Sequence, residues 1–281
     1  MPRLRALRLF PGLNVTIGNG ATLRSHYAAD GGVRAVFSSK VADYVASRPD
    51  YPAALFDSLQ AHCELPPGAL IADVGAGTGL LSRGLLQRGW RVAGVEPNAS
   101  MRAAADHDFA GQAGYRSLDG SAEAMPLERS SVELVTAAQA FHWFDVDAAR
   151  AEFLRVLKPR GQVALIWNDR LHSDALHQAL DGLFAEFGGA KRAAMPEQEG
   201  RSDVPRFFGA HTPQRYSWPH EHRLDAAGLA SLAFSRSYMP ARDSDVGRAA
   251  AQRVARLFEN LAVDGRVVVR YTTVAIVGRP G

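Results

Sequence analysis

The sequence predicts an α/β protein with a doubly wound sheet of seven mostly parallel strands, an antiparallel final strand and a helical cap inserted near the C-terminus. Three observations support this fold class. Apolar strand patterns alternate with helical patterns between residues 69 and 168. The first of these strands ends in three glycines at alternate positions and passes directly into a helical pattern. Helical stretches then fill most of 170–265 before a long alternating strand pattern returns at 266–277.

Two helices are predicted ahead of the core. Residues 1–36 contain prolines and glycines that break any helical pattern, so we expect a flexible N-terminal extension there. A helix that ends at Arg48 brings Tyr44, Arg48 and Tyr51 to one side, because these residues are spaced by four and three positions. Prolines then end that helix and open the next one, over 53–61.

The core alternates strands with helices. The predicted strands cover 69–74, 91–96, 113–117, 132–137 and 162–167, and the predicted helices cover 79–88, 98–106 and 146–156. This alternation gives a parallel sheet with right-handed crossovers and helices on both faces. Ligands in such a sheet bind beyond the carboxyl ends of the strands, so we expect the functional site at that edge.

The C-terminal part departs from this rhythm. Helices are predicted over 172–187, 225–236 and 248–261, and strands over 214–218 and 266–277. We expect the two strands to form an antiparallel closing pair and the helices to cap the pocket. The chain is therefore predicted to form one domain over 37–281, with its core at 69–168 and its cap and closing strands at 170–281.

The glycine loop after the first core strand carries the most specific signal. Gly75, Gly77 and Gly79 allow a tight turn and close approach of a ligand to a helix N-terminus. A dinucleotide fingerprint would require a third small residue at position 80, but this chain has the large Leu80 there, so the loop does not match that fingerprint. The second strand ends in Glu96, which lies 21 residues after Gly75 and at the position where a carboxylate grips a ribose diol.

These segments, taken together, resemble a known family. The motifs are Asp73-Val-Gly-Ala-Gly-Thr-Gly79 with Glu96-Pro-Asn98, Gly120-Ser-Ala-Glu-Ala-Met-Pro126, Ala138-Gln-Ala-Phe-His-Trp-Phe144 and Leu157-Lys-Pro-Arg-Gly161. They are similar to the class I S-adenosylmethionine-dependent methyltransferases, which have a Rossmann-like fold. The continuation resembles the small-molecule branch with a methyltransferase type 11 domain, which includes trans-aconitate and quinone-biosynthesis methyltransferases. The resemblance runs from about Phe37 to the C-terminus.

The resemblance implies roles for individual residues. The implied cofactor-binding residues are Asp73, Gly75, Ala76, Gly77, Gly79, Glu96, Pro97, Ser121, Ala122, Glu123, Ala138 and Gln139. The resemblance also implies a substrate-binding role for Tyr44, Arg48 and Tyr51, and the alternative is a surface arginine with packing tyrosines. Two further substrate-binding candidates follow from their positions after strands, namely Trp143 and Asn168. Glu96 is expected to accept both ribose hydroxyls of S-adenosylmethionine, and the turn at Ser121 to contact its adenine.

Methyl transfer from a sulfonium requires a nucleophile held close to the methyl carbon and the removal of any proton that it carries. His142 follows the fourth core strand, and its ordinary pKa near 6.5 suits a general base. The alternative is a histidine that caps the strand. A carboxylate acceptor needs no base, and arginines such as Arg48 or Arg170 would then position it.

The composition narrows the possible function classes. The formal net charge is +3 without a run of five basic residues, which argues against nucleic acid, and no apolar stretch approaches the roughly 20 residues of a membrane span. The single cysteine, Cys63, fits a reducing compartment, and we expect a cytoplasmic monomer or homodimer. No His-x-x-x-His or Cys-x-x-Cys pattern indicates a metal site.

The leading hypothesis is a methyltransferase for a small organic acceptor, with oxygen favoured over carbon or nitrogen. Leu80 disfavours the alternative of a nicotinamide-dependent oxidoreductase. Ser121 and Arg160 depart from the residues usual in the family, Asp or Thr at the first position and Gly at the second. A catalytically silent cofactor-binding or scaffold protein therefore stays open, although Asp73 and Glu96 argue against it.

Overall fold

The structure is a computed structural model that describes residues 25, 27, 28, 32, 38, 40–171, 173–193 and 201–281. At positions 42, 44 and 46 it describes the backbone alone. Most of the predicted N-terminal extension, residues 1–36, thus lies outside the described residues.

One sheet of seven strands forms the centre of the molecule, in the order β3-β2-β1-β4-β5-β7-β6. The strands are β1 (Leu70–Val74), β2 (Arg91–Val95), β3 (Tyr115–Leu118), β4 (Val132–Ala138), β5 (Leu157–Arg170), β6 (Gln214–Leu224) and β7 (Val267–Gly278). The pairs from β3 to β5 are parallel, whereas β7 is antiparallel to both β5 and β6. The predicted sheet, with its antiparallel final strand, is confirmed.

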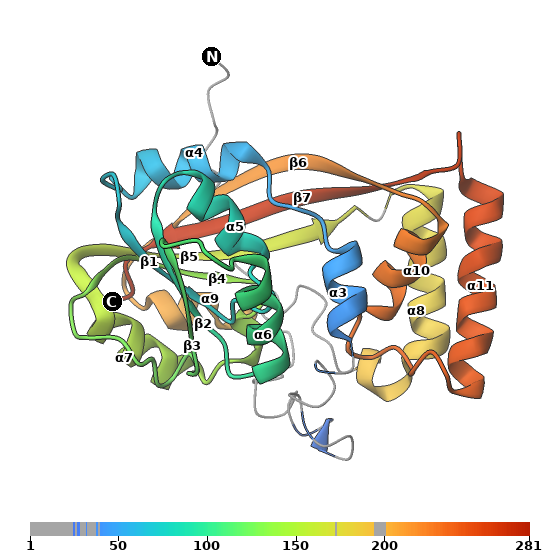
Figure 1. Cartoon of the computed structure of the whole chain (residues 1–281), viewed down its shortest axis with the longest axis horizontal. Coiled ribbons are helices and arrows are strands. Elements are labelled where there is room, and N and C mark those ends of the chain that lie inside the picture. Colours follow the sequence, from blue (N-terminus) through green and yellow to red (C-terminus); the bar gives the residue numbers. More distant parts are fainter. Residues whose placement is uncertain are drawn as a thin grey trace.

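Helices cover both faces of the sheet (Figure 1). They are α3 (Val41–Ser47), α4 (Ala53–His62), α5 (Leu80–Gln87), α6 (Ala99–Asp108), α7 (Val146–Val156), α8 (Ala175–Ala193), α9 (Val204–Phe208), α10 (Ala226–Phe234) and α11 (Asp245–Leu261). Ile71 of β1 packs in one apolar cluster with α4 and α5, whereas its neighbour Ala72 packs in another with α7 and α9. This alternation follows from the two-residue period of a strand that is buried on both faces.

Helices α8, α10 and α11 form the cap at one end of the sheet (Figure 1). They share a third apolar cluster, to which Phe184, Leu229 and Val254 contribute one residue from each helix. The cap also buries Val269 of β7, so the long closing strand extends from the central sheet into the cap. The predicted helical insertion is therefore present, although its first expected residue, His172, lies outside the described residues.

Helix α3 is attached to the cap by polar contacts. The Nζ atom of Lys40 donates to the carbonyl oxygens of Phe234 and Met239 at 3.0 Å each, at the C-terminal end of α10, where the helix dipole favours a cation. Burial lowers the pKa of Lys40 to about 8. The carboxylate of Asp43 pairs with Arg242. These contacts fix the direction in which α3 delivers its next residue, Arg48.

The two strands β5 and β6 are longer than predicted. β5 starts at Leu157 rather than 162, across a register irregularity between β4 and β5. β6 continues to Leu224 rather than 218, because it pairs with β7 along its whole length. The less exposed positions of this extension include His220 and His222, so the alternation of apolar and polar residues that predicts a strand is missing there. The short helix α9 was not predicted, because its five residues are fewer than two helical turns.

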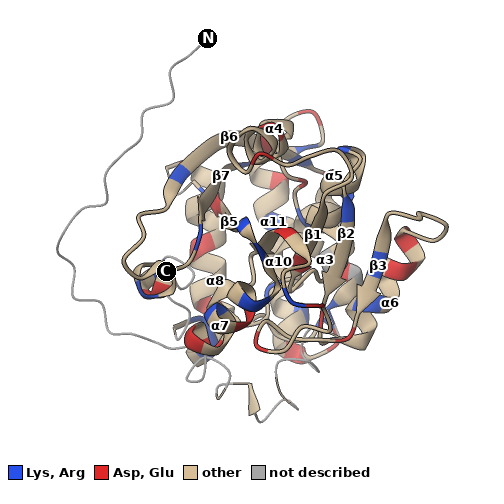
Figure 2. Ribbon diagram, turned by 90° about the vertical axis from the view of Figure 1, so that its left-hand side faces the viewer, with Lys and Arg blue, Asp and Glu red and all other residues tan. Residues whose placement is uncertain are grey.

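Basic and acidic residues are interspersed along the ribbon in Figure 2. Arginines pair with carboxylates nearby, as Arg83 does with Asp108 at 2.8 Å and Arg102 with Asp119 at 3.0 Å. A nucleic-acid footprint would instead require one sign of charge gathered in a stripe. Within the described part of the chain, no helix combines the length and the apolar character that crossing a bilayer requires.

Candidate active site

The glycine loop joins β1 to α5 with a backbone that only glycine adopts readily. Gly75, Gly77 and Gly79 have φ values of 67°, 58° and 82°. A Cβ atom at position 75 would lie 2.6 Å from the Cβ of Ala140, and one at 79 would lie 2.3 Å from the ring of Phe109. A Cβ at position 77 would meet nothing within 4 Å. Packing thus explains the outer two glycines, whereas Gly77 faces open space where a ligand can approach the backbone.

Glu96 follows β2 and binds the glycine loop directly. Its Oε2 accepts the N–H of Gly77 at 3.0 Å, and its Oε1 accepts the N–H of Asn98 at 2.9 Å. Burial raises the pKa of this carboxyl, against the effect of the two backbone donors. A carboxylate offers about four acceptor sites, so two stay for a ligand with paired hydroxyls. Pro97 lies between Glu96 and Asn98, which caps α6 with its own side chain.

Asp73 lies beneath the loop rather than on its surface. Its carboxylate is 1% exposed and accepts the hydroxyls of Ser82 at 2.7 Å and Thr136 at 2.9 Å. Burial raises its pKa to about 6. These bonds connect β1 with α5 and β4, so Asp73 holds the loop in place. Ala76, at the start of the loop, donates its N–H to the carbonyl of Val95 at 3.3 Å.

The predicted adenine turn lies between β3 and β4. Ser121 and Ala124 exchange two backbone hydrogen bonds, at 3.1 and 3.2 Å, with Ala122 and Glu123 at the tip between them. The carboxylate of Glu123 accepts the N–H of Asp145 at 2.8 Å, which anchors the turn to the start of α7. Ala122 is buried, so its contribution to a ligand would come through the backbone.

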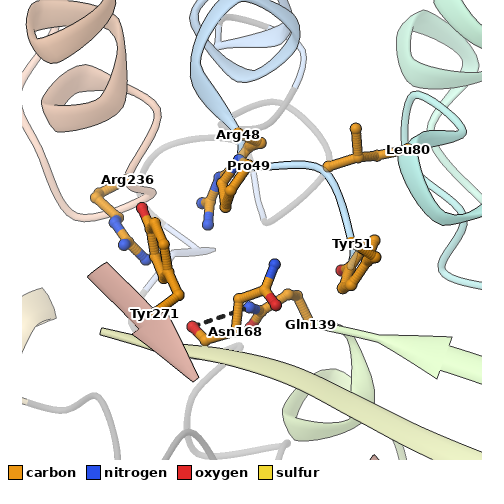
Figure 3. A pocket seen from close by; sticks show the side chains of 8 residues that line it. All are labelled: Arg48, Pro49, Tyr51, Leu80, Gln139, Asn168, Arg236 and Tyr271. Atoms are coloured by element: carbon orange, nitrogen blue, oxygen red, sulfur yellow. Dashed lines mark hydrogen bonds between the residues drawn. The ribbon is translucent and has the colours of Figure 1, made fainter. Parts of the chain in front are cut away.

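A pocket opens where the cap meets the carboxyl ends of the strands (Figure 3). It is lined by Arg48, Pro49, Tyr51, Leu80, Gln139, Asn168, Arg236 and Tyr271. Leu80 is the first residue of α5, so the pocket adjoins the glycine loop. This lining contains two guanidinium groups and no carboxylate.

Four of these lining residues were predicted from the sequence, namely Arg48, Tyr51, Gln139 and Asn168. Gln139 follows β4 with a φ of 55°, a conformation rare for a residue with a side chain and frequent at functional sites. Its Nε2 donates to the carbonyl of Asn168 at 3.4 Å (Figure 3). Ala138, the last residue of β4, is half-buried just before it. Gln139 and Asn168 thus lie at the carboxyl ends of the neighbouring strands β4 and β5.

Arg236 and Tyr271 were not identified from the sequence. Tyr271 belongs to the alternating apolar pattern of the last strand, which is the one signal that it faces inward. Arg236 follows α10 and resembles any other arginine of the chain. Arg170, by contrast, binds Asp181 at 2.8 Å and lies over the ring of Phe184, so it is not among the lining residues.

Three predicted site residues, Tyr44, His142 and Trp143, are not among the lining residues of the pocket. His142 and Trp143 belong to a 3-10 turn after β4, with their ring centroids 5.0 Å apart. The rings of Trp143 and Tyr27 also meet edge-on, with their centroids 5.6 Å apart. Tyr44 lies on α3, but its side chain is outside the described residues. Over the ranges that the structure describes, no three His, Cys, Asp or Glu residues are grouped to hold a metal ion.

Comparison with known proteins shows the family. The model of a methyltransferase domain matches residues 72–165. An uncharacterized methyltransferase of Mycobacterium tuberculosis is 33% identical over 248 residues, which cover 85% of this chain and 93% of the relative. An uncharacterized methyltransferase-like protein of Schizosaccharomyces pombe is 38% identical over 135 residues, which cover 48% of this chain and 52% of that protein.

Solved structures show the same fold. One named as a type II methyltransferase from Anaeromyxobacter dehalogenans has a TM-score of 0.61 at 23% identity, over 83% of this chain and 97% of that one. Another, named as a methyltransferase from an antibiotic biosynthesis pathway of Anabaena variabilis, has a TM-score of 0.55 at 19% identity, over 82% and 98%. The open cradle at Gly77 and the half-buried carboxylate of Glu96 fit the donor that this family uses. The chain therefore belongs to the class I S-adenosylmethionine-dependent methyltransferases.

Proposed function

We propose that the glycine loop and Glu96 hold S-adenosylmethionine, and that the pocket between cap and sheet holds a small organic acid that is methylated on oxygen. When bound, S-adenosylmethionine supplies a methyl group on a positively charged sulfur. Glu96 accepts the ribose hydroxyls with its two remaining acceptor sites, and the backbone of Ala122 and Glu123 contacts the adenine. Asp73 acts on the cofactor through the loop that it holds.

The positive charge of the pocket lining supports a carboxylic acid as the methyl acceptor. Arg48 reaches the pocket from the end of α3, and Arg236 from the cap (Figure 3). Two guanidinium groups that line one pocket attract a shared anion, and a planar carboxylate matches their donors. Because Leu80 joins the pocket to the glycine loop, an acid held there lies beside the donor site. This agrees with the resemblance to the branch that includes trans-aconitate and quinone-biosynthesis methyltransferases.

Two oxygens of such an acceptor are possible nucleophiles, and they differ in their need for a base. A carboxylate oxygen is already deprotonated, so holding it in line is sufficient. A hydroxyl oxygen must lose a proton, and His142 is the candidate base. The aromatic residues around the 3-10 turn, Phe141 and Phe144, are buried and exclude water from that side.

The experiment is methyl transfer from radiolabelled S-adenosylmethionine to a panel of mono-, di- and tricarboxylic acids, each beside its amide. We expect turnover of at least one acid, with its amide disfavoured. Arg48→Ala and Arg236→Ala should each raise the KM for that acid by about 10- to 100-fold, as expected for one charge-assisted contact. Arg83→Ala, on the exposed side of α5, is the matched control. Equal turnover of acid and amide would contradict the proposal, as would an unchanged KM in both pocket variants.

A further inference from the structure

Three polar side chains from neighbouring strands form a row next to the pocket. Asn168 of β5 lies directly opposite Thr273 of β7. His220 of β6 lies opposite Tyr271, which is two residues from Thr273 and therefore on the same face of β7. Thr273 is fully buried and Asn168 is 8% exposed. Of the three, Asn168 alone lines the pocket.

The hydrogen bonds in this row have a defined direction. The hydroxyl of Thr273 donates to Oδ1 of Asn168 at 2.6 Å. The same hydroxyl oxygen lies 3.2 Å from Nδ1 of His220. A hydroxyl has one hydrogen, and it is already donated to Asn168, so His220 must be the donor in this second contact. His220 therefore carries a hydrogen on Nδ1.

The surroundings of His220 keep its ring neutral. Burial lowers its pKa, and the nearby His222 lowers it further. The ring stacks on Tyr271, with centroids 5.3 Å apart and an angle of 19° between the planes. Its Nε2 is buried without a hydrogen-bond partner among the described residues, which suits a nitrogen that carries no hydrogen. The chain of donors thus runs from His220 to Thr273 to Asn168.

This chain fixes the side-chain amide of Asn168. Because His220 donates to the Thr273 oxygen, a flipped amide would place a second donor on that oxygen and leave the hydroxyl hydrogen without its acceptor, Oδ1 of Asn168. Its NH2 group then occupies the other branch of the amide, as a donor beside the guanidinium groups of Arg48 and Arg236. A flipped amide would present an acceptor in the same place and would repel an anion.

We propose that His220 is a positioning residue that acts through Thr273 to hold the NH2 group of Asn168 toward the acceptor, so that the pocket prefers acids over neutral amides. This rests on the proposed function, because it assigns the pocket to the methyl acceptor. A merely structural row would stabilise the sheet without affecting the choice between acid and amide. The acid-to-amide preference therefore separates the two roles.

The test compares disruptive variants with conservative ones. Thr273→Val removes the hydroxyl and keeps the shape, whereas Thr273→Ser keeps the hydroxyl. His220→Phe removes the donor, whereas His220→Asn places an amide N–H at the position of Nδ1. KM and kcat are measured for the preferred acid and its amide, together with the affinity for S-adenosylhomocysteine by calorimetry.

We expect Thr273→Val and His220→Phe to raise the KM for the acid by about 3- to 10-fold and to lower the acid-to-amide preference by the same factor. The affinity for S-adenosylhomocysteine should stay unchanged, and the Ser and Asn variants should retain the wild-type preference. An unchanged preference in the folded disruptive variants would overturn the inference. An equal loss for acid and amide would do the same.

A spectroscopic measurement tests the inference without any substrate. The ¹⁵N shifts of the histidine rings, with the His220 signals assigned by their loss in His220→Asn, report which nitrogen carries the hydrogen. We expect a neutral ring protonated at Nδ1. A ring protonated at Nε2 instead would overturn the positioning role even if the enzyme methylates acids. Absence of turnover for every acid, with the expected Nδ1–H ring, would overturn the proposed acceptor and with it the assigned preference.

Discussion

Replacing Glu96 by glutamine tests the donor site most sharply, because it changes charge and hydrogen bonding while keeping the size. Each carboxylate oxygen now accepts one backbone N–H, from Gly77 and from Asn98. Glutamine keeps one acceptor oxygen, but its NH2 group replaces the other oxygen, so a donor then faces one of the two backbone N–H groups. It also removes the negative charge that would receive the ribose hydroxyls.

The expected loss follows from these contacts. A hydrogen bond to a charged group contributes about 1.5–3 kcal/mol, and 1.4 kcal/mol corresponds to a factor of ten. Glu96→Gln should therefore weaken the affinity for S-adenosylhomocysteine by about 10- to 100-fold, measured by calorimetric titration. The backbone N–H that loses its acceptor should also lower the free energy of unfolding by about 1–3 kcal/mol.

Glu133→Gln separates these two effects. Glu133 accepts the N–H of Leu70 at 2.8 Å and pairs with Lys158, at the amino ends of the same parallel strands. Its replacement should lower stability comparably and leave the affinity for S-adenosylhomocysteine unchanged. Wild-type affinity in Glu96→Gln, or an equal loss of affinity in both variants, would contradict a ribose contact at Glu96.

Four further variants probe the base, the loop and the buried carboxylate. His142→Ala should lower kcat by roughly 10²–10⁴ for a hydroxyl acceptor and leave S-adenosylhomocysteine affinity unchanged, in steady-state assays; full activity on hydroxyl acceptors would make it structural. Gly79→Ala should lower the free energy of unfolding in urea by about 2–5 kcal/mol, because its Cβ meets Phe109 and φ is positive. Gly77→Ala should lower it by only about 1–2 kcal/mol, because only φ is unfavourable there. Equal losses would contradict the contact with Phe109. Asp73 has a folded pKa of about 6, above its ordinary 3.8. Its protonated form therefore stabilises the fold below pH 3.8, and that contribution is lost as the pH rises through 6. Relative to Asp73→Asn, the free energy of unfolding of the wild type in urea should fall between pH 4 and 7, and a constant difference would refute the buried acid.

The glycine loop and Glu96 could be predicted because their signals are local. A positive φ or a carboxylate at a strand end is imposed by a few neighbouring residues, so it leaves a trace in the sequence. The parallel direction of the core strands follows equally from the alternation of strand and helix patterns.

The cap side of the pocket could not be predicted in the same way. Arg236 enters the site because α10 docks beside α3, through contacts of Lys40 and Asp43 that span about 200 residues of chain. Thr273 and His220 become neighbours through the register of β7 with β6. Such relations depend on tertiary pairing, for which a single sequence carries no periodic signal.

We expect the glycine loop of this chain to bind S-adenosylmethionine. Calorimetric titration of the wild-type protein with S-adenosylhomocysteine, and separately with NADH, tests it directly. We predict micromolar affinity for S-adenosylhomocysteine and no heat from NADH. Binding of NADH without binding of the sulfur compound would contradict the account and would reopen the nicotinamide alternative that Leu80 disfavours.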